Sequence, residues 1–167
     1  MKCVSRVLKG ISVALITCAL LIGTVFITQE SSRSYQGDEA YLVGQLHQLT
    51  GGKLRISTHA MTGRARFIGT ELSDAILQPA IISAEATPEE AARGFLSTYG
   101  SLFGLKDQSR ELTVMRSKAV DRGRAFVRFQ QVYSGLPILG GELIVQVNSS
   151  NDILSANGEI LPDIDVD

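Results

Sequence analysis

Residues 124–147 read RAFVRFQQVYSGLPILGGELIVQV and indicate two β-strands joined by a short turn. Apolar or small residues recur at every second position of the second strand, the period of a sheet with one buried face. That face is expected to carry Leu139, Gly141, Leu143, Val145 and Val147. Ser134 and Gly135 supply the backbone freedom for a reversal, and Pro137, which has no N–H to donate, belongs at the beginning of a strand. The stretch therefore predicts an antiparallel hairpin.

The best-specified helix lies upstream, in residues 86–105, ATPEEAARGFLSTYGSLFGL. Thr87 is a suitable N-cap, Pro88 suits the first helical position, and Glu90 completes a Thr-x-x-Glu capping box. Gly104 supplies a stop after Phe103. The apolar residues between these signals form one broad stripe, so we expect a helix over about 88–103 that packs on the sheet.

Other segments complete the expected architecture. A second helix is expected to begin at Asp38, followed by a weaker hairpin over 53–69 with Ala65 and Phe67 facing inward. Further strands are expected within 111–119 and 153–160. Together these elements predict an α+β fold with a mostly antiparallel sheet. The expected divisions are a helix and hairpin over 38–84, a second subdomain over 85–162 and a frayed tail over 163–167.

The N-terminal 30 residues are expected to direct export. Lys2, Arg6 and Lys9 precede the apolar run ISVALITCALLIGTVFIT, residues 11–28, which is typical of a secretory signal or a signal anchor. Cleavage would give a secreted or envelope protein, and retention would anchor the chain in a membrane through residues 11–28 alone. A polar linker, residues 31–37, follows. Both cysteines lie before the linker, so no disulfide is expected after it.

The run RFQQVYSGLPILGGE, residues 128–142, together with the helix before it, resembles the fungalysin/thermolysin propeptide domain. The resemblance extends over about Ala86 to Pro162. In that family the domain belongs to the pro-region of secreted thermolysin-like zinc metallopeptidases. The pro-region folds ahead of the protease, assists its folding and keeps it inactive until cleavage. The resemblance therefore implies an exported, non-catalytic domain.

Two sets of residues stand out within the resembling region. The candidate interface consists of Arg128, Phe129, Gln130, Gln131, Tyr133 and Glu142. Residues expected to matter for structure are Thr87, Pro88, Glu90, Gly135, Pro137, Gly140 and Gly141. One interpretation of the polar positions is a water-facing strand side on which Arg128 pairs with Glu142 across the hairpin. The other interpretation is a sheet surface that docks on a protein domain.

Enzymatic chemistry is not expected from this chain. A thermolysin-like zinc site needs His-Glu-x-x-His on a helix, whereas the chain has only His47 and His59, neither followed by Glu. No Gly-x-Ser-x-Gly occurs, and no cysteine follows the N-terminal segment. We expect no catalytic, metal or cofactor site. The 16 basic and 17 acidic residues are balanced, so no nucleic-acid partner is expected.

Two functions are compatible with these observations. The first is a propeptide-type domain that assists and inhibits a metallopeptidase catalytic domain in cis, in a chain truncated before that domain. The second is a self-standing exported or membrane-anchored module that binds a partner protein in trans. A metallopeptidase reading frame directly downstream would favour the first, and a retained anchor the second.

Overall fold

The computed structural model describes residues 38–71, 73–79, 82–83 and 85–164. The expected signal or anchor over 11–28 and the linker over 31–37 lie outside these residues. Within the described part of the chain, no helix combines the length and apolar character needed to cross a membrane. Residues 42–164 belong to one compact unit, and the description below concerns that unit.

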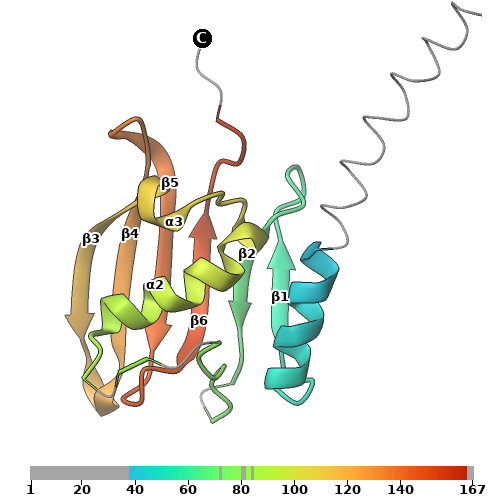
Figure 1. Cartoon of the computed structure of the whole chain (residues 1–167), viewed down its shortest axis with the longest axis vertical. Coiled ribbons are helices and arrows are strands. Elements are labelled where there is room, and N and C mark those ends of the chain that lie inside the picture. Colours follow the sequence, from blue (N-terminus) through green and yellow to red (C-terminus); the bar gives the residue numbers. More distant parts are fainter. Residues whose placement is uncertain (1–37, 72, 80–81, 84, 165–167) are drawn as a thin grey trace, which may run out of the picture. The chain divides into compact units, whose positions relative to one another are not determined.

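Six antiparallel strands form a single sheet in the order β1-β2-β6-β5-β4-β3 (Figure 1). The strands are β1 (Arg55–Thr58), β2 (Ala65–Gly69), β3 (Leu112–Ala119), β4 (Ala125–Tyr133), β5 (Leu136–Val147) and β6 (Ile153–Glu159). The last strand lies between β2 and β5, so it joins the early hairpin to the strands that follow α2. β1 and β3 are the two edges of the sheet.

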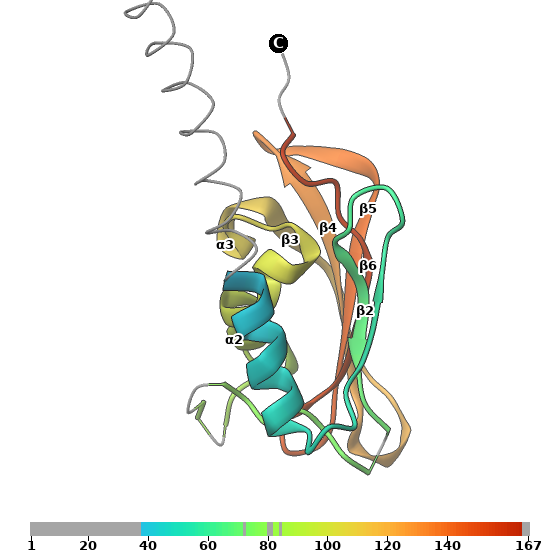
Figure 2. The same ribbon diagram turned by 90° about the vertical axis from the view of Figure 1, so that its right-hand side faces the viewer.

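The helices lie on one side of this sheet (Figure 2). They are α2 (Pro88–Tyr99), the 3₁₀ turn η1 (Gly100–Phe103), the short α3 (Gln108–Glu111) and residues 42–49 of a helix over 38–49. A further 3₁₀ turn, η2 (Asp121–Gly123), connects β3 to β4. The predicted α+β class is confirmed. The predicted helix over about 88–103 is α2 with its last turn tightened into η1.

α2 begins with the capping box that the sequence predicted. The Thr87 side chain accepts a hydrogen bond from Glu90 N (3.2 Å), and the Glu90 carboxylate accepts one from Thr87 N (2.7 Å). The Thr87 main-chain N–H and hydroxyl both donate to the Glu90 carboxylate and hold the pKa of Glu90 below its usual value of 4.5. A lowered pKa means that the stabilisation is complete above that usual value and is lost as the pH falls through the folded-state pKa. At the other end, Gly104 adopts φ 97° and ends η1.

The apolar stripe of α2 and η1 forms the centre of the core. Phe95, Tyr99 and Phe103 are buried almost completely, and the Phe95 and Tyr99 ring centroids lie 5.1 Å apart. Burial of each such side chain stabilises the fold by roughly 1.5–3 kcal/mol. Facing them are the inward residues of the central strands, Val127, Phe129, Leu143, Val145, Val147 and Ala156. Helix 38–49 adds Leu46, which is fully buried.

Two of the expected alternations are wrong in detail. Thr58 pairs with Ala65 and Ser57 with Phe67, so Arg66 is an extra residue in β2. This bulge leaves Ala65 inward but turns Phe67 to the opposite face, where it is half-buried. In β5 the inward series begins at Gly141. Leu139 is fully exposed because Gly140, at φ 78°, interrupts the alternation.

Replacing Thr87 by Ala tests the cap. We expect Thr87→Ala to lower the free energy of unfolding by about 1 kcal/mol, because the Glu90 main-chain N–H loses its side-chain acceptor. Ser97→Ala removes a hydroxyl from the same helix without touching the cap and is the matched control. Urea unfolding followed by circular dichroism measures both. Equal stability of the two variants would contradict this role of Thr87.

Candidate functional site

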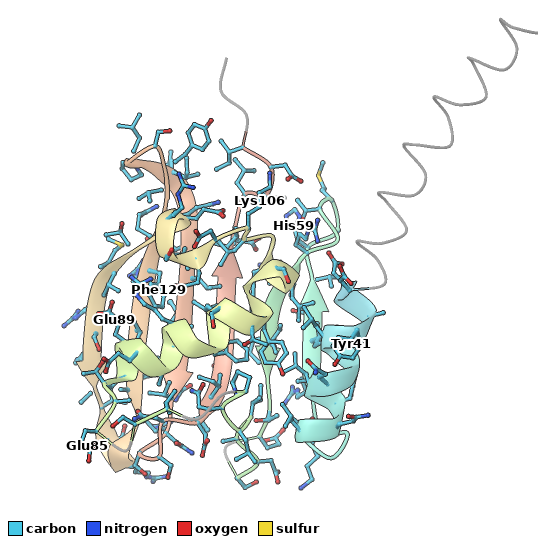
Figure 3. The ribbon with its side chains drawn as sticks, viewed as in Figure 1. Tyr41, His59, Glu85, Glu89, Lys106 and Phe129 are labelled. Atoms are coloured by element: carbon cyan, nitrogen blue, oxygen red, sulfur yellow. The ribbon has the colours of Figure 1, made fainter. Side chains whose placement is uncertain are left out.

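The predicted hairpin is formed by β4 and β5, with Phe129 on the side facing α2 (Figure 3). Ser134 and Gly135 form the two-residue turn, both with positive φ, 49° and 81°. This is the conformation of a type I′ turn, which matches the twist of antiparallel strands. Pro137 is the second residue of β5, as its missing N–H requires. The turn residues therefore have the structural role expected of them.

Gln131 is a fully buried polar residue that ties two distant segments together. Its side-chain nitrogen donates to Leu161 O (2.8 Å), and its side-chain oxygen accepts from Leu161 N (2.9 Å). A buried amide must find such partners, because an unsatisfied polar group inside a protein is costly. The Gln131 amide thus bonds to Leu161 as a neighbouring strand would. We call this pair of hydrogen bonds the Gln131–Leu161 clamp.

Gly141 makes room for the clamp. A Cβ at Gly141 would lie 2.8 Å from Gln131 Oε1 and 2.9 Å from Gln131 Cβ, closer than real side chains approach. Gln130, directly before the clamp, donates from its side-chain nitrogen to Ile138 O (2.7 Å) and Gly141 O (2.9 Å). It thereby binds carbonyl groups where the β4–β5 register shifts, between Gln130 and Val132. The two glutamines and the glycine form one structural unit.

Arg128 and Glu142 lie on the face of the sheet opposite the helices. Arg128 Nε donates to Glu142 Oε2 (3.0 Å), and Nη2 bonds the same oxygen. The expected cross-strand pair is therefore confirmed. An ion pair with both side chains this exposed contributes about 0–1 kcal/mol. The pair leaves this face charged without adding much stability.

Phe129 lies in the core, under an arginine that the sequence did not single out. The Arg93 guanidinium lies over the Phe129 ring at 5.2 Å from its centroid. The same group bonds Glu89 Oε1 (3.0 Å), Gln108 Oε1 (2.9 Å) and Leu112 O. Arg93 therefore joins α2, α3 and β3. Its position four residues after Glu89 was the one signal available in the sequence.

The six candidate interface residues lie in different environments in the structure. Phe129 and Gln131 are fully buried, so neither side chain can contact a partner in this conformation. The Gln130 amide is occupied by main-chain carbonyl groups, and Tyr133 is half-buried near the turn. Only Arg128 and Glu142 share an open surface. An interface that includes these residues stays a prediction.

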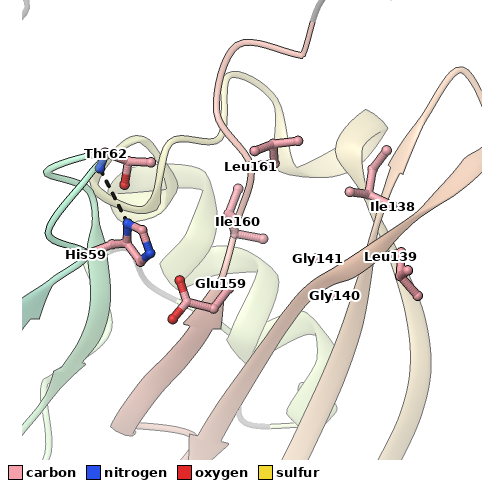
Figure 4. A pocket seen from close by; sticks show the side chains of 9 residues that line it. All are labelled: His59, Thr62, Ile138, Leu139, Gly140, Gly141, Glu159, Ile160 and Leu161. Atoms are coloured by element: carbon pink, nitrogen blue, oxygen red, sulfur yellow. Dashed lines mark hydrogen bonds between the residues drawn. The ribbon is translucent and has the colours of Figure 1, made fainter.

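A hollow of about 210 Å³ lies at one end of the sheet (Figure 4). β6 ends at Glu159, while the β1–β2 loop and the first residues of β5 continue past it on either side. The hollow between them is lined by His59, Thr62, Ile138, Leu139, Gly140, Gly141, Glu159, Ile160 and Leu161. Its walls are mostly aliphatic. The clamp fixes its floor, because Leu161 is bonded to Gln131.

Neither histidine is arranged for catalysis. His47 is exposed on its helix, and His59 Nδ1 accepts hydrogen bonds from Met61 N (3.3 Å) and Thr62 N (3.4 Å). Across the described ranges, no three His, Cys, Asp or Glu side chains gather closely enough to hold a metal ion. Glu159 at the hollow is paired with Arg66 (2.7 Å).

The sequence that forms β3 to β6 is similar to that of known proteins. Residues 110–160 match the Fungalysin/Thermolysin Propeptide Motif, which confirms the resemblance seen in the sequence. Thermolysins of Alicyclobacillus acidocaldarius subsp. acidocaldarius, Bacillus caldolyticus and Bacillus sp. (strain EA1) are each 31% identical over 86 residues. The aligned part is 51% of this chain but only 16% of each relative.

Replacing Gln131 by Leu tests the clamp. We expect Gln131→Leu to lower the free energy of unfolding by about 2 kcal/mol or more, because two hydrogen bonds are lost and the Leu161 main chain loses its partner. Gln146→Leu, a half-buried change on the opposite face of β5, is the control and should lie within about 0.5 kcal/mol of the parent. Chemical unfolding measures both. A Gln131→Leu protein as stable as the control would contradict the clamp.

Proposed function

We propose that this chain is a propeptide-type domain that binds the catalytic domain of a thermolysin-like metallopeptidase, assists its folding and holds it inactive. The observation that carries the proposal is the propeptide motif over residues 110–160. These residues include β3 to β6, four of the six strands, and much of the core. The motif thus coincides with a folded unit.

The proposed mode of action is protein–protein contact without chemistry. The motif residues Gln130, Gln131 and Gly141 are used to build the hairpin, and the two histidines form no catalytic arrangement. We propose that the chain is not itself a peptidase. A prefolded domain can assist a second domain by binding its native-like state, since any ligand that binds only the folded state stabilises it.

Export belongs to the same proposal. The basic residues and apolar run at the N-terminus have the composition of a signal or anchor, and the relatives that match are thermolysins. A chain exported in this way would meet a metallopeptidase outside the cytoplasm.

Binding in trans, as a separate exported module, is a second candidate. It is favoured by the self-contained core of the described unit, in which residues from α2 and from five strands are buried together. A domain with its own core can fold in advance of its partner. It can then act whether or not the two are joined.

A refolding assay in trans tests the proposal. Purified full-length chain is added to a denatured thermolysin-like catalytic domain, and recovered peptidase activity is followed. We expect recovery above the no-addition sample, and slow inhibition of the mature enzyme, because the folded domain binds the native catalytic domain. Val127→Asp, which places a carboxylate in the core, is the unfolded control and should do neither.

The pro-region of one of the thermolysin relatives serves as the positive control. Neither recovery nor inhibition by the parent chain, under conditions where that pro-region gives both, would contradict the proposed function. Peptidase activity of the purified chain alone, abolished by a chelator, would contradict its non-catalytic role.

A further inference from the structure

Exposed aliphatic side chains gather at one end of the sheet. The β1–β2 loop, the β4–β5 turn and the chain after β6 all lie at this end (Figure 1). The apolar residues there are Met61 (90% exposed), Leu136 (69%), Leu139 (103%) and Leu161 (52%). Single exposed apolar residues are ordinary, but a group beside a hollow is typical of an interaction site.

The exposure of Leu139 follows from the backbone. In an uninterrupted strand, Leu139 would point the same way as the buried residues Leu143 and Val145. The positive φ of Gly140 breaks the alternation and directs Leu139 into solvent, and regular pairing with β4 resumes at Glu142. A large aliphatic side chain is thus held outward, next to the hollow shown in Figure 4.

The surface is also held in place before any partner binds. The Gln131–Leu161 clamp fixes the floor of the hollow, and the bonds of Gln130 to Ile138 O and Gly141 O fix the wall formed by the first residues of β5. Binding to a surface that is already ordered avoids much of the entropic cost of association. The end of the hairpin therefore presents the protruding Leu139 side chain and the adjacent hollow in fixed positions.

The chain leaves the fold beside this surface. Pro162 packs against Gly104, where an added Cβ would lie 2.9 Å from Pro162 Cβ, and Asp163 pairs with Lys106 (3.0 Å). In the proposed zymogen, a domain that followed Ile164 would be tethered near the hollow, and the tether would raise its effective concentration there. A second hollow, on the open sheet face, differs in combining three cationic side chains with two apolar ones: it is lined by Arg116, Lys118, Phe126, Arg128 and Ile144.

We propose that the hairpin-end surface, formed by Met61, Ile138, Leu139, Ile160 and Leu161, is the docking site for the metallopeptidase catalytic domain. Leu139 enters an apolar recess of that domain, and an aliphatic side chain of the domain fills the hollow beside Ile160. This inference rests on the proposed function. It names the surface through which that function is carried out.

Binding of full-length variants to a folded thermolysin-like catalytic domain, measured by isothermal titration calorimetry, tests the inference. Leu139→Ser should weaken binding, raising the dissociation constant about tenfold or more, as expected for a buried anchor. Leu139→Met keeps an aliphatic side chain and should bind within about threefold of the parent. Met115→Ser, an exposed methionine on β3, is the matched control and should bind like the parent.

Because Leu139 is fully exposed, the thermal midpoint of Leu139→Ser should equal that of the parent, which separates binding from folding. Parent-like binding by Leu139→Ser would overturn the inference and leave the proposed function standing. Loss of binding by the double variant Arg116→Ala/Lys118→Ala, with Leu139→Ser still binding, would overturn it in the same way, since docking would then use the open sheet face. No binding by the parent chain would contradict the proposed function and this docking site together.

Discussion

The buried amide of Gln131 is the constraint on which the central part of this structure depends. A side chain with both donor and acceptor groups lies in an apolar interior, where each group needs a partner. The main chain of Leu161 satisfies both. Since these residues are 30 positions apart, the contact fixes where the chain runs after β6 and closes the sheet at that end.

Glycines and a second glutamine accommodate the close packing of β4, β5 and β6. Gly141 has no side chain because the Gln131 amide occupies the space, and Gly158 allows β6 to approach β5 closely, since a Cβ there would collide with the Glu142 main chain. Gln130 stabilises the carbonyl groups around the shifted register. The glutamines and glycines through which the sequence resembles the propeptide domain are therefore mainly parts of the fold. Contacts with another molecule would have to be made by neighbouring residues.

Local signals in the sequence were sufficient for much of the architecture. The Thr87–Glu90 capping box, the Ser134–Gly135 turn and the Arg128–Glu142 pair depend on residues that are close in sequence or diagonal neighbours across a hairpin, and all three are present. The predicted inward-facing residues were wrong where a single backbone feature changed the alternation of inward and outward side chains. The bulge at Arg66 turned Phe67 outward, and Gly140 turned Leu139 outward.

The candidate site was harder to anticipate, for a physical reason. Glutamine is usually found on the protein surface, and Gln131 is buried favourably only because its amide meets a partner 30 residues away. Likewise, the contact of Arg93 with Phe129 joins elements that the sequence alone does not place side by side. Periodicity assigns a residue to one face of an element, but it does not identify the distant main-chain group that the side chain will meet.

Amide hydrogen exchange of Leu161, followed residue by residue by NMR, tests the central claim most directly. Leu161 lies beyond the end of β6, so without the clamp its amide would exchange like that of a loop. The Gln131 bond predicts protection comparable to that of the buried amides of β5. Exchange of Leu161 as fast as that of the residues in the β1–β2 loop would show that the clamp does not hold the chain in solution.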